Sequence, residues 1–454
     1  MQLVVMGSGY VGLVAAACLA QAGHKVAYVD IDAAKIEAFR VGRLTIYEPA
    51  LGPLIKQNLM RGRLRFSTDV AGEVGQAAGI FIAVGTPSRP GDGHVDLSFV
   101  RNACKTVGSA LRPGALVVIK STVPAGTSDM LERDMRAANP ELRFSLVTNP
   151  EFLREGLAVN DFTKPDRIII GSSDRAAAER LRSVYAPMFD GPAPILFTDR
   201  STAEMIKYAS NAFLATKIGF INEIAELCEK VGANVTEVAQ GMGMDGRIGP
   251  KFLTAGPGFG GSCFPKDVRG LIQTGRDHGT PMAIIEAVAA SNEARKRASG
   301  QRAVRAAGGK IGGWRVALLG LAFKANTDDM RESPAIEVIE GLRGAGARVV
   351  AYDPRAMKQA RLLGLDIEYA ASAMECIAGA DMLVVVTEWP EFARLDLMEV
   401  KRALKRPIVV DLRNVFDPRR MAELGFRYEG VGGAAIGAAA IGGTAIRRVK
   451  QPAA

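Results

Sequence analysis

The chain has 454 residues, of which 48% are hydrophobic and 23% are charged, and its formal net charge is +9. This length predicts two or three domains, and no apolar run reaches the roughly 18 residues that a membrane helix needs. Because basic residues are spread among acidic ones, the charge indicates a solvated surface around an anionic small ligand rather than a nucleic-acid partner.

The five cysteines are odd in number and form no CxxC pair. This pattern argues against a disulfide framework and against a metal site of the zinc type, and it predicts a reducing compartment. The first twenty residues are apolar enough for a signal peptide but lack a basic start, so we expect a cytoplasmic protein.

The first thirty residues predict a βαβ unit, with a strand at 3–7, a helix at 10–23 and a strand at 25–30. Further short β-branched runs alternate with helix-like stretches, which is the pattern of a parallel sheet covered by helices. These runs are residues 79–87, 115–124 and 144–150.

One long helix is predicted from about residue 201 to residue 235, because apolar residues recur there at helical spacing without proline. A second helix is expected over 281–298, and the strand and helix alternation restarts at residue 315. The predicted fold class is therefore α/β, with two Rossmann-like doubly wound parallel-sheet domains joined by a long central helix. The expected segments are 1–200, a helical 201–305, 306–430 and a flexible Gly/Ala-rich tail at 431–454.

The stretch "GSGYVG" places Gly7, Gly9 and Gly12 between a strand and a helix. These glycines permit a tight turn, close approach of a pyrophosphate and close helix packing. Asp30 ends the next strand, where a carboxylate accepts from ribose hydroxyls and repels a 2′-phosphate, so NAD is favoured over NADP. Lys35 keeps NADP open, since a nearby cation can accommodate that phosphate. The second sheet domain has one glycine, Gly320, at the equivalent turn, and we expect no second dinucleotide there.

"GPGFGGSCFPKD" at 256–267 combines a glycine loop with a cysteine and the predicted start of a helix. Cys263 at the positive end of that helix, with Lys266 close by, is expected to ionise more readily than a free thiol and to act as a nucleophile. Asp267 lies one turn further on the same face. A buried structural cysteine is the alternative, which fits Cys18 and Cys228 better because their surroundings are apolar.

Three further stretches carry candidate polar groups. Lys207 and Asn211 are one helical turn apart and can polarise a hydroxyl or stabilise an oxyanion, although this spacing is also typical of a solvated face. In "TNPEFLREG" a helix capped by Asn149 is expected to carry Glu151 and Glu155 on one face, with dipole pairing as the alternative.

Thr122 follows a predicted strand, where open α/β sheets place ligand-binding groups. In the second sheet domain, three cations near strand ends can hold a phosphate-bearing ligand, or they are ordinary surface charges. They are Lys324, Arg331 and Arg413.

Together these stretches resemble the UDP-glucose 6-dehydrogenase family, within the nucleotide-sugar dehydrogenases. The resemblance covers residues 1 to about 430 and rests on seven motifs in order. They are "GSGYVG", "VGTP" (84–87), "STVP" (121–124), "NPEFLREG" (149–156), "KYASN" (207–211), "GPGFGGSCFPKD" and "FKANTDDMRESPA" (323–335). The tail after residue 430 matches nothing in this pattern.

The resemblance implies a cytoplasmic homodimer that oxidises C6 of UDP-glucose to a carboxylate with two NAD, in nucleotide-sugar metabolism and polysaccharide biosynthesis. It implies that Cys263 forms a thiohemiacetal and then a thioester with the sugar. Lys207 would stabilise the oxyanion and Asp267 would assist proton transfer or activate water. Thr122, Glu151 and Glu155 would position water and act in acid–base steps, with the general base left open.

The resemblance also implies two sets of contacts. NAD would contact Gly7, Gly9, Tyr10, Val11, Gly12, Asp30, Lys35, Val84, Thr86, Thr122, Glu155, Lys266 and Arg331. The nucleotide sugar would contact Glu151, Phe152, Leu153, Lys207, Asn211, Phe252, Leu253, Gly256, Phe259, Gly260, Cys263, Phe323, Lys324 and Arg413, with Arg247 reaching it from a neighbouring subunit.

Other functions stay open at this point. Hydroxyacid and 6-phosphogluconate dehydrogenases are similar in pairing a Rossmann domain with K-x-x-x-N but need no nucleophilic cysteine, so Cys263 argues against them. A sister activity on UDP-N-acetylmannosamine or GDP-mannose would keep the mechanism and change the pocket. A catalytically silent NAD-binding module is disfavoured by the intact Cys263, Lys207 and Asn211.

Overall fold

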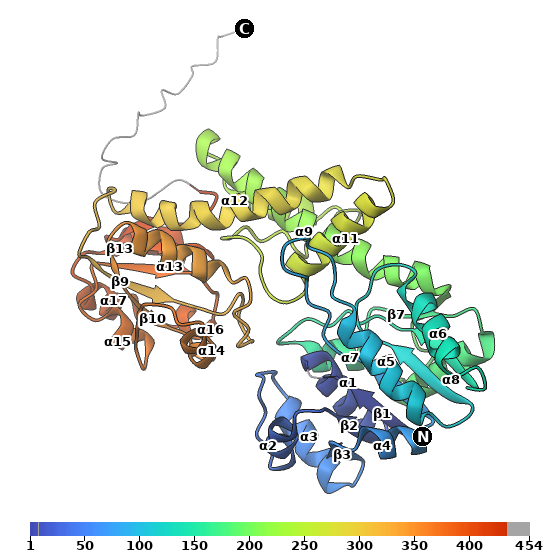
Figure 1. Cartoon of the computed structure of the whole chain (residues 1–454). Helices are drawn as coiled ribbons and strands as arrows, with labels where there is room; N and C mark the ends of the chain where they lie inside the picture. Colours follow the sequence, from blue (N-terminus) through green and yellow to red (C-terminus); the bar gives the residue numbers. More distant parts are fainter. Residues whose placement is uncertain (8, 434–454) are drawn as a thin grey trace. The chain divides into compact units, whose positions relative to one another are not determined.

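The computed structural model describes residues 1–7 and 9–433 and divides the chain into two compact units (Figure 1). The first unit comprises Met1–Lys217, Phe259–Ser291 and Lys324–Glu332. The second comprises Ile218–Gly258, Asn292–Phe323 and the residues from Ser333 onward. The expected flexible tail lies outside the described residues from position 434. The expected central domain at 201–305 divides between the two units, so its boundaries stay a prediction.

The first unit contains an eight-stranded sheet in the order β3-β2-β1-β4-β5-β6-β7-β8. Its neighbours pair in parallel, except that β6 and β7 are antiparallel. The order reverses between β1 and β4, which is where open α/β sheets bind ligands. The strands are β1 (Gln2–Met6), β2 (Lys25–Val29), β3 (Leu64–Ser67), β4 (Gly79–Ile82), β5 (Ala115–Ile119), β6 (Phe144–Thr148), β7 (Ile168–Gly171) and β8 (Ile195–Thr198).

Helices cover both faces of this sheet, because alternate strand residues point to opposite sides and both sides are apolar. Leu3 and Val5 enter one core with α1, α3, α7 and α8, whereas Val4 and Met6 enter the other with α4, α5 and α6. The helices are α1 (Tyr10–Gln21), α2 (Ala33–Arg40), α3 (Leu51–Met60), α4 (Val70–Gln76), α5 (Ser98–Ala110), α6 (Thr127–Ala138), α7 (Ala158–Thr163), α8 (Arg175–Tyr185), the 3-10 turn η1 (Ala186–Met188) and α11 (Phe264–Asp277).

The second unit contains a six-stranded parallel sheet in the order β11-β10-β9-β12-β13-β14. Its strands are β9 (Arg315–Leu319), β10 (Arg348–Tyr352), β11 (Glu368–Tyr369), β12 (Met382–Val385), β13 (Ile408–Asp411) and β14 (Arg427–Glu429). Its helices are α10 (Val235–Gly243), α13 (Pro334–Gly344), α14 (Met357–Leu362), α15 (Ala373–Ile377), α16 (Pro390–Ala393), α17 (Leu397–Ala403) and α18 (Pro418–Glu423).

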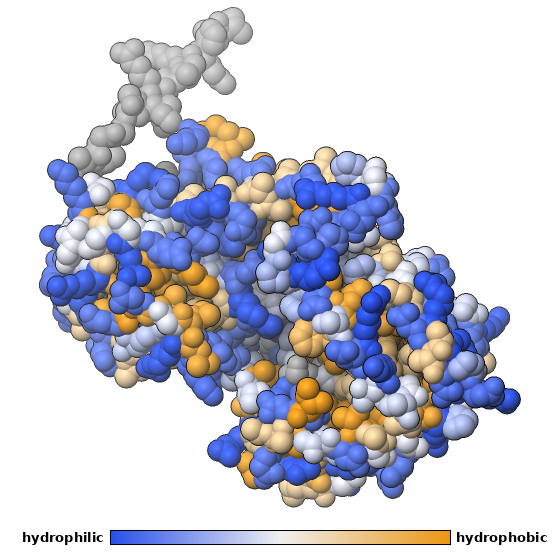
Figure 2. Space-filling view, in the orientation of Figure 1, coloured by the Kyte–Doolittle hydropathy of each residue, from blue (hydrophilic) through white to orange (hydrophobic). Residues whose placement is uncertain are grey.

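Two long helices, α9 (Arg200–Val231) and α12 (Ala283–Ala306), each begin in the first unit and end in the second. The predicted α/β fold with two parallel sheets and one long central helix is therefore confirmed. Hydrophilic and hydrophobic side chains are interspersed on the face drawn in Figure 2. Among residues 1–7 and 9–433, none of the helices has the length and apolar composition to span a membrane.

Candidate active site

The glycine loop after β1 has the geometry that the sequence predicts for a pyrophosphate site. Gly9 is the N-cap of α1, and a Cβ atom built there would meet nothing within 4 Å. A Cβ atom on Gly7 would collide with the carbonyl oxygen of Ala83, and one on Gly12 would lie 3.3 Å from the oxygen of Gly7. The loop therefore needs small residues to pack, and it leaves the N-terminal end of α1 accessible to an anion.

Asp30 lies just beyond β2 and is buried. One carboxylate oxygen accepts from the backbone N–H of Asp32 at 3.1 Å, and the other pairs with Nζ of Lys35 at 3.0 Å. The lysine charge is thus directed at Asp30 in this structure. Asp30 thus presents a carboxylate at the end of β2, where such a group accepts from ribose hydroxyls.

Asp353 follows β10 at the equivalent place in the second sheet, but it is differently engaged. Its two carboxylate oxygens accept from Trp389 Nε1 at 3.0 Å and from four backbone N–H groups. Because these internal donors already occupy it, Asp353 acts as a structural anchor for its own loops and helix start.

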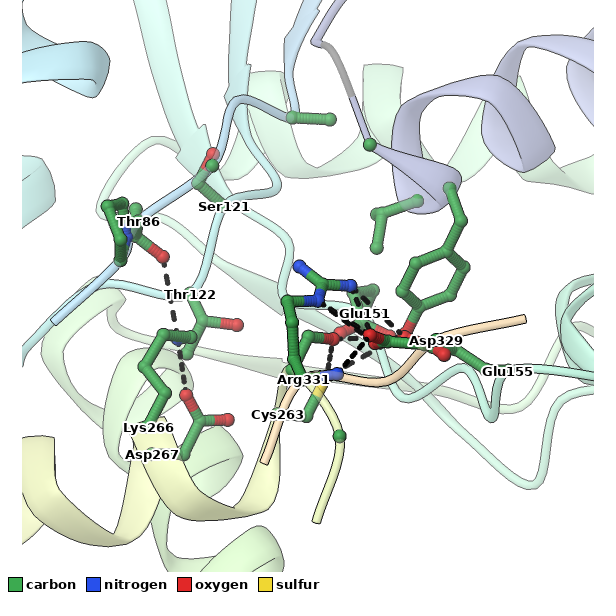
Figure 3. Close-up of a pocket in the computed structure, with 18 of the residues that line it drawn as sticks. Thr86, Ser121, Thr122, Glu151, Glu155, Cys263, Lys266, Asp267, Asp329 and Arg331 are labelled. Carbon is green, nitrogen blue, oxygen red and sulfur yellow. Dashed lines mark hydrogen bonds and ion pairs between the residues drawn. The ribbon is translucent and has the colours of Figure 1, made fainter. Parts of the chain in front are cut away.

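A cavity of about 690 Å³ lies in the first unit, at the carboxyl ends of β1, β4, β5 and β6. It gathers predicted residues from six separate stretches of the chain (Figure 3). They are Gly9, Tyr10, Val11, Val84, Thr86, Thr122, Glu151, Glu155, Cys263, Lys266, Asp267 and Arg331. The sequence thus predicted much of the wall of one cavity, although these residues are up to 322 positions apart.

Cys263 is the N-cap of α11, so the helix starts at Phe264 and Pro265 is its second residue. The thiol faces the cavity, where Sγ lies 3.8 Å from the Tyr10 hydroxyl and 3.5 Å from Oγ of Ser262. The other four cysteines are buried, which agrees with core packing.

The expectation that Cys263 ionises more readily than a free thiol is wrong for this structure. Burial raises the pKa of Cys263, and the carboxylates of Glu151, Asp267 and Glu155 raise it further against the lowering effect of Lys207. Lys266 pairs with only one of these carboxylates, since its Nζ lies 2.5 Å from Asp267 Oδ1. The surroundings of Cys263 therefore favour the neutral thiol.

Lys207 and Asn211 point into the protein from α9, so the solvated-face alternative is wrong for both. Lys207 pairs with Glu151 Oε1 at 3.0 Å, and Asn211 donates to Asp267 Oδ2 at 2.6 Å. All four side chains are buried. Burial pulls the pKa of Lys207 down, but Glu151, Cys263 and Asp267 outweigh it and hold that pKa above its ordinary value.

The predicted helix at "NPEFLREG" is absent, because residues 149–154 form no regular structure and the next helix starts at Ala158. Asn149 does not cap a helix. Its Oδ1 accepts from Tyr185 at 2.6 Å and from Lys120 at 3.1 Å, and its Nδ2 donates to Ile169 O at 2.8 Å. These contacts with other elements hold the chain extended beyond β6.

Glu151 and Glu155 nevertheless reach the same cavity from this loop. Glu151 Oε2 accepts from the backbone N–H of Leu153 at 2.5 Å. Glu155 is buried and accepts from Ser262 Oγ at 2.9 Å and Thr327 Oγ1 at 3.0 Å. Burial and the nearby Asp329 raise the pKa of Glu155 to about 7, against the lowering effects of Arg331 and the two hydroxyls.

Several expected sugar-contacting residues also lie in the first unit. The centroid of the Phe152 ring lies 3.7 Å from the guanidinium carbon of Arg167 and 5.4 Å from Nζ of Lys207. Leu153 accepts from the Tyr10 hydroxyl at 3.4 Å through its carbonyl. Phe259 packs edge-on to Phe264, Gly260 is buried, and Lys324 acts electrostatically on Glu48.

The remaining expected residues lie in the second unit. Arg413 donates to the Phe323 carbonyl at 2.8 Å, and a Cβ atom on Gly256 would lie 3.1 Å from Nη1 of Arg413. Leu253 is buried and Phe252 has a left-handed backbone at φ 66°. Arg247 is exposed and pairs with Asp245. The residues expected to contact the nucleotide sugar are thus divided between the two units.

Lys120, for which no sequence motif predicted a role, follows β5 and lines the cavity. Its ammonium is buried and contacts neutral acceptors, namely Asn149 and Tyr185. Burial lowers the pKa of Lys120 to about 8, with Lys207 adding to the shift and Glu151 opposing it. The sequence signal that could have indicated Lys120 is its position directly after a fully apolar strand.

Comparisons with known proteins show the family of this chain. Residues 1–189 match the NAD binding domain of the UDP-glucose/GDP-mannose dehydrogenase family, residues 201–294 its central domain and residues 317–418 its UDP binding domain. The prediction that NAD is the cofactor is therefore confirmed.

A UDP-glucose 6-dehydrogenase from Rhizobium meliloti (strain 1021) is 52% identical over 434 residues, which are 95% of this chain and 99% of the relative. A solved UDP-glucose dehydrogenase from Pyrobaculum islandicum is 41% identical with a TM-score of 0.88, covering 95% of this chain and 98% of that one. A UDP-D-ManNAc dehydrogenase from Pyrococcus horikoshii is 28% identical with a TM-score of 0.83, covering 95% and 99%. Because three domain matches follow one another in order and a full-length relative shares half of the sequence, the chain belongs to the UDP-glucose/GDP-mannose dehydrogenase family.

Proposed function

We propose that this protein oxidises the C6 hydroxyl of UDP-glucose to the carboxylate of UDP-glucuronate with NAD. The observation that carries the proposal is a cavity that Cys263 and Asp267 line together with Gly9 of the dinucleotide-binding loop, while Lys207 acts electrostatically on the Cys263 thiol. The R. meliloti relative, at 52% identity, supports UDP-glucose as the substrate.

The stoichiometry follows from electron counting. Converting a primary alcohol to a carboxylate removes four electrons, and NAD, when bound, accepts two electrons and one proton as a hydride in each of two rounds. One turnover therefore consumes two NAD and one water. The intermediate aldehyde must stay bound between the rounds, which is the task that a covalent nucleophile performs.

In the first round a carboxylate receives the proton of the C6 hydroxyl while C6 loses its hydride. Glu151 and Glu155 are the carboxylates of the loop after β6, and Thr122 lies beside them after β5. The ion pair with Glu151, at 3.0 Å, fixes the position of the Lys207 ammonium. That ammonium would stabilise the oxygen on C6 as negative charge develops there.

In the second round the sulfur of Cys263 bonds to C6 of the aldehyde, and the thiol proton passes to a neighbouring base. The thiohemiacetal loses its hydride and becomes a thioester. Water then attacks the thioester carbon, the C–S bond breaks, and the carboxylate leaves while Cys263 recovers a proton. Asp267, which accepts from Asn211 and Lys266, would orient that water.

Recognition of the two ligands is divided along the chain. NAD would be held by the glycine loop, by Asp30 and by further residues of the first unit. These are Gly7, Gly9, Gly12, Tyr10, Val11, Lys35, Val84, Thr86, Thr122, Glu155, Lys266 and Arg331. Residues 317–418 would bind the UDP part, with Arg413 and Phe323 as contacts. Arg247 is 90% exposed at its side chain, which suits a residue that serves a neighbouring subunit in a homodimer. The five unpaired cysteines favour the cytoplasm.

The experiment is a substrate panel. Purified protein is incubated with NAD and, separately, UDP-glucose, UDP-N-acetylmannosamine, GDP-mannose and 6-phosphogluconate, and NADH and sugar acid are both quantified. Two NADH for each UDP-glucuronate support the proposal. One NADH for each sugar supports a hydroxyacid-type reaction, a better turnover of another nucleotide sugar reassigns the substrate, and no turnover with any sugar indicates a silent NAD-binding protein.

The covalent route has its own test. Cys263→Ser should release uronate far more slowly than wild type and accumulate an oxidised, enzyme-bound sugar that mass spectrometry detects. Cys104→Ser, a buried cysteine on α5, serves as the matched control. Uronate release at the wild-type rate by Cys263→Ser would exclude the thioester.

A further inference from the structure

The short segment Lys324–Glu332 follows β9 in the chain but belongs to the first unit. Two of its non-glycine residues, Asn326 at φ 65° and Glu332 at φ 51°, have left-handed backbones. Asn adopts this conformation more readily than most residues, whereas for Glu332 it is uncommon and persists where the surrounding structure imposes it. Between these two positions the segment lines the cavity with Thr327, Asp329 and Arg331.

Contacts from three other elements fix this segment in place. Gly261 in the cysteine loop donates to the Arg331 carbonyl at 2.8 Å, and Tyr47 donates its backbone N–H to Asp328 Oδ1 at 3.1 Å. Arg269 on α11 pairs with Glu332, with 3.2 Å between Nη1 and Oε2. The segment is therefore held as a fixed wall rather than resting on a single contact.

The loop that carries Glu155 packs against this wall at backbone distance. Gly156 has φ 81°, and a Cβ atom built on it would lie 2.6 Å from the carbonyl oxygen of Asn326. A side chain at position 156 would push the two backbones apart. Glycine at this position thus lets the residue before it, Glu155, reach the hydroxyl of Thr327.

The hydroxyl of Thr327 has a defined direction. It accepts from the backbone N–H of Asp329 at 3.2 Å and donates to Glu155 Oε2 at 3.0 Å. Ser262 donates to the other carboxylate oxygen at 2.9 Å. Two hydroxyls from different elements therefore hold both oxygens of one buried carboxylate, and they prevent its rotation.

We propose that Thr327 is a positioning residue for the oxidation, which acts by fixing the orientation and the protonation of Glu155. This inference rests on the proposed function, and it assigns to the 324–332 segment a role in the chemistry besides contact with NAD. The other titratable and charged groups that face Glu155 are Asp329 and Arg331 from the same segment, Cys263 from α11 and Tyr10 from α1. Of the two hydroxyl donors to Glu155, Thr327 is the one that lies between the left-handed residues Asn326 and Glu332.

The expected consequence has a definite sign. A hydroxyl that donates to a carboxylate stabilises its charged form and lowers its pKa. Burial and Asp329 raise the pKa of Glu155, and Thr327→Val removes one of the hydrogen bonds that lower it. The pKa of Glu155 should therefore rise above its present value of about 7. Because a hydrogen bond to a charged group contributes about one pH unit or more, we expect an upward shift of about one unit.

The test compares the pH profiles of kcat for wild type, Thr327→Val and Thr327→Ser with UDP-glucose and NAD. In Thr327→Val the limb near pH 7 should move up by about one unit, with the KM for UDP-glucose changed less than twofold. Thr327→Ser keeps the hydroxyl and should restore the wild-type profile. Thr163→Val, which removes a hydroxyl bonded only to backbone carbonyls on α7, should leave the limb unmoved.

The outcomes separate this inference from the proposed function. If wild type fails to form two NADH for each UDP-glucose, the proposed function fails. If wild type meets that ratio but the Thr327→Val limb stays in place or moves down, the role of Thr327 is refuted. A Thr327→Val protein with a lowered unfolding temperature and an unmoved limb also refutes it, because that result is what a purely structural hydroxyl gives.

Discussion

Lys207 and Glu151 form an ion pair with 3.0 Å between Nζ and Oε1, although 56 positions separate them in the chain and both side chains are buried. The pair lies beside the cavity that contains Cys263, and Lys207 acts electrostatically on that thiol. A buried pair of this kind is weak evidence for stability, since a well-packed apolar pair is often as stable. Its position next to the nucleophile gives the better reason for its presence.

Breaking one half of this pair should therefore destabilise more than removing both halves. Lys207→Met should lower the free energy of unfolding by about 3 kcal/mol, because it leaves the Glu151 charge buried and without its partner. Lys207→Met combined with Glu151→Gln should recover much of that loss. Urea unfolding of the two single variants and the double variant measures the coupling.

Activity should not follow the recovered stability. Lys207→Met and the double variant should both stay at least about a hundredfold below wild type in kcat, because each lacks the Lys207 cation. A double variant that regained activity together with stability would show that the pair only supports the fold.

The sheet framework was predictable because burial on both faces leaves continuous β-branched runs, as in 115–119 and 382–385. The long α9 was predictable for a similar reason, since its apolar spacing extends over many turns. The glycine loop and Asp30 were readable because their function depends on a short stretch of chain and on the type of residue at each position.

The misread features depend on contacts that are distant in sequence. Asn-Pro-Glu reads locally as a helix start, but Lys120 and Tyr185 take the Asn149 side chain from other elements. The ionisation of Cys263 was misjudged because Lys266 is adjacent in the chain, whereas the charges that act on the sulfur come mainly from Glu151 and Lys207. Local spacing carries no information about such partners.

The raised pKa of Cys263 predicts a slow thiol in the ligand-free protein. Alkylation of Cys263 by iodoacetamide, followed by mass spectrometry of its peptide, should be slower at pH 8 than alkylation of a free cysteine. Asp267→Asn removes a charge that raises this pKa and should speed the reaction roughly tenfold, whereas Lys207→Met should slow it by a similar factor.

The opposite signs of these two variants are the decisive feature. Asp174→Asn removes an exposed carboxylate that caps α8 and serves as the control with no expected change. Equal rates in all variants would contradict the electrostatic account of this cysteine.

The Asp30–Lys35 pair predicts how cofactor choice can be altered. Asp30→Ser removes the carboxylate that repels a 2′-phosphate and releases Lys35 from this ion pair, so the NAD over NADP preference in kcat/KM should fall at least about tenfold. Asp32→Ser removes a neighbouring carboxylate whose role is to cap α2, and it should keep the preference. An unchanged ratio in Asp30→Ser would place the discrimination elsewhere.

Lys120 predicts a dependence of stability on pH with a defined window. Its pKa is about 8 in the folded protein against an ordinary value of 10.5, so between these values the unfolded chain binds more protons. Stability should therefore rise with pH across this window, and Lys120→Met should remove the rise and add about 3 kcal/mol at pH 7.

The same variant separates function from folding. Burying the Lys120 ammonium destabilises the folded protein, so we expect this lysine to be needed for the reaction. Lys120→Met should lower kcat while the unfolding temperature stays the same or increases, whereas Lys105→Met on the exposed side of α5 should change neither. If Lys120→Met lost stability and kept full kcat, the ammonium would be a packing element for Asn149 and Tyr185 and have no part in the chemistry.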